Sequence, residues 1–327
     1  MLFRSAPVSG ASAVAVNAGS FIWNIAGLLP TATYQLRVTR NVDTNVVASS
    51  GTFRVGRNIV YYVNDASPSN DLWCTATGDD ANNGLTPGFP KATVQAVVNT
   101  YDLDGGDQVR IDTGLYNLTN DVVVAAADSG VATALVNFVA SPYGVTFDRG
   151  NTNAFACWSF NGVQFAQLTT TNDSTLAGVT QRWVRLTGAG RGGHITSQGN
   201  RFTRCEFVSN TLYGVLISAT AGASNNVIEN CLARDSIDPA TGVGFYLGNA
   251  RATVRNCTSS GNGRYALRLV GATLAMLSNN ILVASLTNSF ALHADNTSSF
   301  SGSDFNLFWA TNNATFAQLN GTNLTNL

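Results

Sequence analysis

Four short segments place polar side chains at equivalent positions, where they could act together chemically. They share alternating large aliphatic residues and read YGVLI (213–217), GFYLG (244–248), YALRL (265–269) and FALHA (290–294). If each is a strand with its aliphatic residues inside, the residues between them face outward. The predicted inward set is Val215, Ile217, Phe245, Leu247, Leu267, Leu269 and Leu292. The predicted outward column is Leu216, Tyr246, Arg268 and His293, and Asp295 follows on the same face.

This outward column contains residue types that bind sugars. An aromatic ring such as Tyr246 stacks on a sugar ring, and Arg268 can form charge-assisted hydrogen bonds with a uronate carboxylate. Arg268 and His293 are also the catalytic candidates, because β-elimination removes a proton next to such a carboxylate. The loop ARDSIDPATG (233–242) would wall this face and supplies the nearest acidic candidates, Asp235 and Asp238. The alternative is a varied, solvated surface without a ligand.

A repeat explains how these segments are positioned. RFTRCEFVSN (201–210), VIENCLARDS (227–236) and TVRNCTSSGN (253–262) align on their cysteines at intervals of 26 residues, and MLSNNILVAS (276–285) continues the series with Asn280 in the cysteine position. Periods of this size indicate stacked supersecondary units. Short strand patterns without helical periodicity favour a β-solenoid over helical repeats.

Stacked coils predict columns of equivalent residues about 4.8 Å apart. Phe202, Ile228, Val254 and Leu277 are expected to form an apolar interior column, and Cys205, Cys231 and Cys257 a second one. That spacing slightly exceeds the usual separation of disulfide Cβ atoms, so buried free thiols are expected. Asn230, Asn256 and Asn279 are expected at bends, where asparagine tolerates left-handed backbone and stacked amides can bond one another.

The segment that precedes the repeats predicts a cap. An apolar strand near residue 60 leads into a polar loop, and ATVQAVVNTY (92–101) has apolar residues at the spacing of one helix face. This order resembles the first turns of right-handed parallel β-helix proteins, the architecture of many pectate lyases, in which a short helix covers the open end. The resemblance implies an all-β fold with a cap over 58–106 and coils over 107–327.

The resemblance carries expectations about chemistry that this sequence meets only in part. Pectate lyases of this architecture use several acidic residues around calcium together with a basic residue. No acidic ladder lies beside Arg268, and the polygalacturonase-like motif set is absent. GGHI (192–195) is too short a fragment to indicate that set, and His194 is interpreted as a turn or partly buried residue as readily as a base.

One acidic turn is a candidate metal site. GDDANNG (78–84) offers Asp79, Asp80 and Asn82 as oxygen ligands for calcium. The alternative is a solvated turn that uses these residues for local hydrogen bonds.

Residues 1–57 predict a separate, partial β-sandwich. Tyr34, Leu36 and Val38 alternate toward one side, as in a half-buried antiparallel sheet. GLLPTATYQLRV (27–38) resembles the corner of fibronectin type III and immunoglobulin-like domains, with Tyr34 as the corner tyrosine. Only about half of such a domain is covered, and the alternative is an unrelated β extension. The natural protein is expected to continue beyond both ends.

Composition limits the partners. Charged residues make up 11% and the formal net charge is −1, so no basic face for nucleic acid is expected. No apolar run reaches the length of a membrane span. We therefore expect a polysaccharide-directed β-helix module of a large secreted or cell-surface bacterial protein. The alternatives are a polysaccharide lyase that acts on uronate-containing glycans, and a structural stalk or adhesin.

Overall fold

This computed structural model describes residues 33–40, 43–54, 58–150, 154–171, 181–218 and 224–324. The chain divides into two compact units, Met1–Ile59 and Val60–Leu327.

The described part of the first unit is an antiparallel pair of strands. Strand β1 (Thr33–Arg40) pairs with β2 (Asp43–Arg54). Leu36 and Val38 are exposed, so the burial predicted for this face is not found in the described strands. The strands predicted to precede them fall in residues 1–32, outside the described residues, and the side chain of Tyr34 lies outside them too. The fibronectin-like resemblance therefore stays a prediction.

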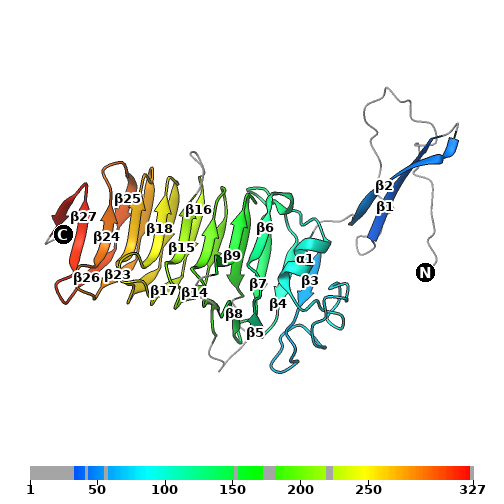
Figure 1. The fold of residues 1–327 in the computed structure, drawn as a ribbon, viewed down its shortest axis with the longest axis horizontal. Helices are drawn as coiled ribbons and strands as arrows, with labels where there is room; N and C mark the ends of the chain where they lie inside the picture. The colour runs from blue at the N-terminus through cyan, green and yellow to red at the C-terminus, as the bar shows by residue number, and fades with distance from the viewer. Residues whose placement is uncertain are drawn as a thin grey trace. The chain divides into compact units, whose positions relative to one another are not determined.

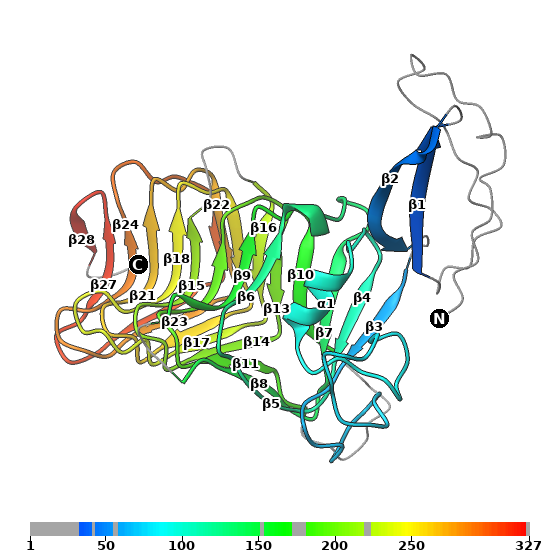
Figure 2. The ribbon, with the colours of Figure 1, turned by 45° about the vertical axis from the view of Figure 1, so that its right-hand side comes forward.

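The second unit is a solenoid of three parallel sheets, and each circuit of the chain adds one strand to each sheet (Figures 1 and 2). The first sheet contains β3 (Val60–Val63), β4 (Gln108–Ile111), β7 (Val136–Ala140), β10 (Ala166–Thr170), β13 (Arg201–Thr203), β16 (Asn226–Glu229), β19 (Ala252–Arg255), β22 (Ala275–Ser278) and β25 (Phe300–Asp304). The second contains β5 (Gly114–Asn117), β8 (Val145–Asp148), β11 (Val184–Thr187), β14 (Cys205–Val208), β17 (Leu232–Arg234), β20 (Thr258–Ser260), β23 (Ile281–Ala284) and β26 (Leu307–Ala310).

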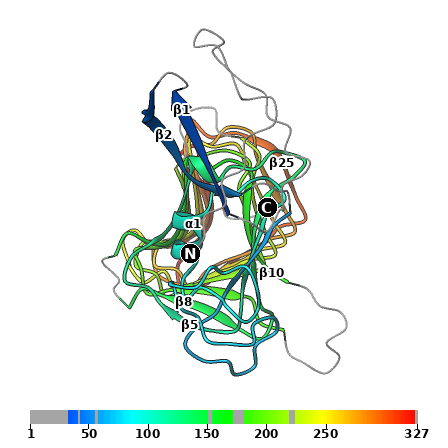
Figure 3. The same cartoon turned by 90° about the vertical axis from the view of Figure 1, so that its right-hand side faces the viewer.

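The third sheet contains β6 (Val122–Ala125), β9 (Ala156–Asn161), β12 (Arg191–Ile195), β15 (Tyr213–Ser218), β18 (Val243–Gly248), β21 (Tyr265–Val270), β24 (Phe290–Ala294), β27 (Thr315–Leu319) and the antiparallel β28 (Thr322–Leu324). A short 3-10 helix, η1 (Ala126–Asp128), follows β6. Seen along the solenoid axis, the strands of successive circuits overlie one another (Figure 3). The predicted parallel β-helix is confirmed.

The bend from the first sheet to the second is made by a single residue with left-handed backbone. Asn230, Asn256 and Asn279 have φ values of 52°, 54° and 55°. Asparagine adopts this conformation at lower cost than most residues, which confirms the role predicted for these three positions. The amide-to-amide hydrogen bond occurs elsewhere, where Asn280 Nδ2 donates to Asn306 Oδ1 at 2.9 Å.

The interior columns follow the repeat, with intervals of 26 residues from Phe202 to Ile228 and Val254 and of 23 residues on to Leu277. Phe202 pairs in register with Ile228, Ile228 with Val254 and Val254 with Leu277, and all four are fully buried. Cys231 contacts Cys205 on one side and Cys257 on the other. The five cysteines are free thiols, and Cys231 Sγ donates to the carbonyls of Phe202 at 3.4 Å and Glu229 at 3.2 Å. Each thiol therefore fills the core and also satisfies backbone oxygen.

The predicted capping helix is present as α1 (Val94–Thr100). Thr93 caps it by accepting a hydrogen bond from the amide of Ala96, and the apolar face buries Val94 and Val97. Gln95 replaces a missing strand at the edge of the third sheet, because it accepts from the amide of Val123 at 2.8 Å and donates to the carbonyl of the same residue. Backbone groups that an open edge would leave unpaired are thereby satisfied.

The described residues contain no helix long and apolar enough to cross a membrane.

Candidate functional site: the outer face of the third sheet

The predicted outward column lies on adjacent strands of the third sheet. Leu216 pairs with Tyr246, Tyr246 with Arg268 and Arg268 with His293. Tyr246, Arg268 and His293 are half-buried. The predicted inward residues are almost completely buried: Val215, Ile217, Phe245, Leu247, Leu267, Leu269 and Leu292. Alternation therefore brings these three side chains onto one face.

The first residue of each strand belongs to the same face, which strict alternation does not predict. In β18 the second residue is Gly244, and a Cβ there would lie 2.0 Å from Ser259 Oγ. The third residue, Phe245, is fully buried as well, so two successive positions face the interior. The first position of the strand is consequently turned outward. Small residues at the second position, glycine or alanine, are the sequence signal that could have revealed it.

This geometry creates an apolar cluster outside the main core. Val243, Tyr265 and Phe290 form it, and the partly buried Tyr213 and Tyr246 pack against it. Tyr265 and Phe290 stack with their ring centroids 5.4 Å apart and their planes 19° apart. Both rings are about nine-tenths buried, so they support their neighbours more than they offer surface to a ligand.

The guanidinium of Arg268 is held by aromatic rings. Its Cζ lies 4.7 Å from the ring centroid of Tyr265 and 5.7 Å from that of Tyr246. The His293 ring lies 5.2 Å from Tyr265 and 5.7 Å from Phe290. Arg268 Nε and His293 Nδ1 are covered and have no hydrogen-bond partner among the described residues. We call Tyr246, Arg268 and His293, with Tyr265 beneath them, the central cluster.

The ionisation of the central cluster favours a neutral histidine next to a cation. Burial lowers the pKa of His293 and the Arg268 guanidinium lowers it further, while Asp295 acts in the opposite direction. Burial raises the pKa of Tyr246, although Arg268 opposes that effect. At neutral pH the cluster therefore combines a positive charge, a neutral imidazole and a neutral phenol.

A second group extends the face toward the N-terminal coils. The Cζ atom of Arg191 lies 4.1 Å from the ring centroid of Phe155 and 5.7 Å from that of Tyr213. Tyr213 in turn packs edge-on against Tyr246 at 5.4 Å. The sequence reasoning missed Phe155, Arg191 and Tyr213. Together with the central cluster they form a continuous strip of rings and guanidinium groups, which we call the aromatic strip.

His194 lies in the same outward column, directly beside Leu216. It is on strand β12 and 7% exposed, so it is buried and not in a turn. Its Nε2 lies 2.7 Å from Ser218 Oγ, and its Nδ1 lies 3.5 Å from Ser159 Oγ. Burial lowers its pKa to about 4, with a smaller contribution from Arg191.

Three acidic residues predicted at this face have their carboxylates engaged locally. Asp295 accepts from the side chains of Thr297 and Ser298, and although partial burial raises its pKa, the sum of these and backbone hydrogen bonds lowers it. Asp235 forms an ion pair with Arg234. Asp238 accepts from the backbone of its own loop, which lowers its pKa. Their predicted contacts with substrate stay predictions.

The turn predicted to bind calcium already holds a protein cation. The buried Lys91 ammonium donates to the carbonyls of Asp80 and Asn82, both at 2.9 Å. The Asp80 carboxylate accepts from the amide and hydroxyl of Thr93, and Asp79 accepts from its own turn. No group of three or more His, Cys, Asp or Glu suited to a metal occurs in the part of the chain that the structure describes. The calcium site stays a prediction.

Comparison with known proteins bears on the fold. Residues 160–325 match the family model described as right handed beta helix region. The chain belongs to the right-handed β-helix family. No curated protein sequence matches it.

Two solved structures are similar to this right-handed β-helix. Pectate lyase Pel9A superposes with a TM-score of 0.50 at 14% identity, covering 80% of this chain and 79% of that one. The GH136 lacto-N-biosidase from Eubacterium ramulus has a TM-score of 0.33 at 12% identity, covering 79% of this chain and 50% of that one. The first similarity supports the architecture, and neither assigns a residue role.

Proposed function

We propose that the outer face of the third sheet binds a polysaccharide. The observation that carries the proposal is the central cluster, in which a half-buried guanidinium and a half-buried imidazole are mounted on aromatic rings. A parallel sheet with half-buried rings on its outer face offers stacking surface to sugar rings. Arg268 offers charge-assisted hydrogen bonds to an anionic substituent.

The comparison supports this direction at the level of fold. One structure with the same architecture is a pectate lyase, so this architecture carries a polysaccharide-directed activity in at least one protein. Fold alone does not transfer that activity, and the proposal depends on the residues of the strip. We further propose a secreted or cell-surface location in a longer multidomain bacterial protein.

The test is binding of Arg268→Ala to a panel of acidic and neutral polysaccharides, measured by affinity electrophoresis. Because Arg268 supplies the charged contact, we expect at least a tenfold loss of affinity for the bound polysaccharide. Arg255→Ala is the matched control, since that arginine lies on the first sheet and pairs with Glu229. Equal polysaccharide affinity of both variants would contradict a binding site at Arg268. Absence of binding by the wild-type protein would favour the stalk or adhesin.

The second candidate is a polysaccharide lyase, and the neutral His293 favours it. An unprotonated imidazole can accept the proton next to a uronate carboxylate, while Arg268 binds that carboxylate. The electron pair of the broken C–H bond then forms the carbon–carbon double bond, and the glycosidic oxygen leaves with a proton from water. The hydroxide that remains takes the proton from the imidazolium, which regenerates the neutral His293. Ultraviolet absorbance of the unsaturated product would report this reaction. Absorbance that rises with the wild-type protein and not with His293→Gln would replace the binding module by the enzyme.

A further inference from the structure

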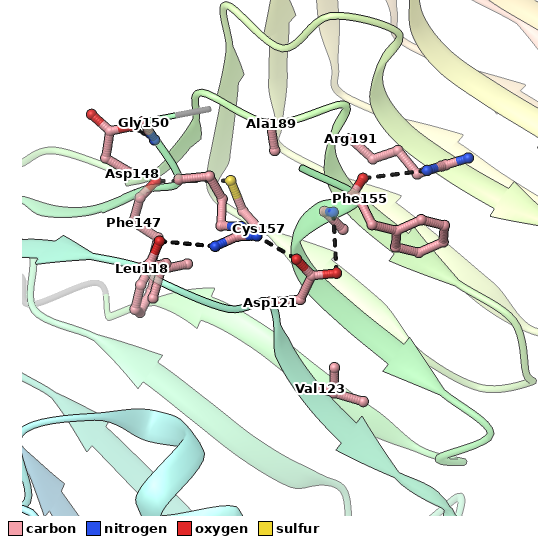
Figure 4. A network of polar contacts seen from close by, with 12 residues as sticks. Leu118, Asp121, Val123, Phe147, Asp148, Gly150, Phe155, Cys157, Ala189 and Arg191 are labelled. Atoms are coloured by element: carbon pink, nitrogen blue, oxygen red, sulfur yellow. Dashed lines mark hydrogen bonds and ion pairs between the residues drawn. The ribbon is translucent and has the colours of Figure 1, made fainter. Parts of the chain in front are cut away.

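The Phe155–Arg191 pair at the N-terminal end of the aromatic strip is not used by the central cluster. Phe155 is 51% exposed, the most exposed ring of the strip, and the guanidinium of Arg191 lies over it at 4.1 Å. Arg191 also donates from Nη1 to the carbonyl of Phe155 at 3.3 Å, which fixes the pair. Figure 4 shows this contact. Like the central cluster, this pair combines an aromatic ring with a guanidinium, and here the ring is exposed.

The local charges leave Arg191 available to an anion. Burial lowers the pKa of the Arg191 guanidinium, and Tyr213 and the carboxylate of Asp121 act in the opposite direction. The Asp121 carboxylate is occupied elsewhere, because it forms an ion pair with Arg149 at 3.2 Å and accepts from the amide of Ala156 at 3.2 Å. Among the described residues Arg191 makes no ion pair, and its Nε is covered without a hydrogen-bond partner. Among the described residues, the Arg191 guanidinium therefore has no carboxylate partner and an incomplete set of hydrogen-bond acceptors.

The register fixes how this pair relates to the central cluster. Arg191 on β12 pairs with Tyr213 on β15, which pairs with Val243 on β18, which pairs with Tyr265 on β21 beside Arg268. Three strand spacings of about 4.8 Å place the two arginines about 14 Å apart along the solenoid axis. Tyr213 and Tyr246 lie between them in edge-to-face contact. A ligand that contacts both arginines crosses these two rings.

We propose that Phe155 and Arg191 form a second subsite, so that the face binds an extended anionic polysaccharide running along the solenoid axis from β12 to β21. This inference rests on the proposed function. It adds that the ligand is anionic, that it runs along the solenoid axis, and that it is long enough to contact both arginines. Two spaced cations recognise repeated negative groups on one chain, and simultaneous contact raises the affinity for a polymer above that for a short fragment.

The experiment compares Arg191→Ala, Phe155→Ala, Arg268→Ala and Arg255→Ala in binding to a polymer and to its disaccharide by calorimetry. Polygalacturonate carries only carboxylates and dextran sulfate carries only sulfates, so these two probes distinguish the two sources of negative charge, and dextran is the neutral probe. We expect Arg191→Ala and Phe155→Ala each to weaken polymer binding about tenfold, with Arg255→Ala unchanged. We also expect polymer affinity to exceed disaccharide affinity in the wild type, and this advantage to shrink in Arg191→Ala.

The outcomes separate this inference from the proposed function. If Arg268→Ala loses binding while Arg191→Ala and Phe155→Ala bind as the wild type does, the second subsite is wrong and the binding face stands. If dextran binds as tightly as the acidic polymers, the anionic ligand is wrong. If none of the variants differs from Arg255→Ala, the proposed function itself fails. Circular dichroism and the thermal midpoint identify a misfolded Arg191→Ala, and Phe155→Ala then decides the question.

Discussion

The arginines on different outer faces of this solenoid have different partners. On the second sheet Arg185 pairs with Glu206 at 3.0 Å, and on the first sheet Arg255 pairs with Glu229 at 2.9 Å, in both cases across neighbouring coils. On the third sheet Arg191 and Arg268 lie over aromatic rings, and neither forms an ion pair within the described ranges. Paired charges on a surface are solvated and weakly interacting. Cations mounted on rings keep their charge available to a ligand.

One arginine on the first sheet also lies near aromatic rings, although it is not part of the proposed binding face. Arg110, close to the cap, lies 5.8 Å from the Tyr62 ring and 5.5 Å from the Trp73 ring. Its Nε donates to Gln108 at 2.7 Å, whereas the Nε atoms of Arg191 and Arg268 are covered and have no hydrogen-bond partner among the described residues. A ring beneath an arginine therefore does not mark a site by itself. What distinguishes the third sheet is the combination of ring, unsatisfied nitrogen and continuity over several coils.

The largest expected effect tests the backbone arrangement that turns the first residue of each third-sheet strand outward. In Gly244→Val the new Cβ would meet Ser259 Oγ at 2.0 Å and the carbonyl of Ala266 at 2.7 Å. Overpacking at a site with no room costs several kcal/mol, so we expect about 3 kcal/mol or more of lost unfolding free energy in urea titrations. Gly302→Val is the control, because nothing lies within 4 Å of its Cβ position. Equal stability of the two variants would mean that the second position does not face the core.

The second-largest expected effect is on the pH dependence of the free energy of unfolding, to which His194 and His293 should contribute differently. His194 has a pKa of about 4 in the folded chain against a usual value of 6.5, so below pH 6.5 the unfolded chain takes up a proton that the folded chain does not. The free energy of unfolding therefore falls as pH drops from 6.5 to 4, by about 3 kcal/mol from this group. We expect a flatter pH dependence in His194→Gln than in the wild type, measured by urea titration at several pH values.

His293→Gln provides the control for this pH effect. His293 is half-buried and its pKa is lowered by burial and by Arg268, so its variant should change the pH dependence less. Burial raises the pKa values of Asp71 and Asp128 to about 6, which gives the opposite slope. That contribution is common to the variants and cancels in their difference. An identical slope in His194→Gln and the wild type would show that His194 is accessible to protons in the folded chain.

The smallest expected effect is that of breaking the ion pair between Arg255 and Glu229 on the first sheet. The side chains of Arg255 and Glu229 are 46% and 22% exposed, so the pair is solvated and screened. A double-mutant cycle with Arg255→Ala and Glu229→Ala should give a coupling energy below about 1 kcal/mol. A coupling well above this value would make the first-sheet arginine a structural residue and unsuitable as the binding control.

Much of the fold followed from the sequence because a stacked coil repeats its spacing. The 26-residue interval predicted the interior column of Cys205, Cys231 and Cys257. The spacing of the apolar residues in 92–101 predicted the capping helix. Alternation placed Tyr246, Arg268 and His293 on one face. Alternation failed at the start of the same strands, where Gly244 and Phe245 both face inward, and so it missed the outward Tyr213.

The sequence by itself determined the coil, its period and which residues fill its interior, because each of these depends on spacing along the chain and on apolar burial. Only the tertiary structure decided that Arg191 and Phe155 join the face of Arg268, since residues 155, 191 and 268 become neighbours of one strip only after several circuits. It also decided that the carboxylate of Asp238 serves its own loop. Which donor meets which acceptor depends on the direction of side chains, and that direction is set by packing across coils.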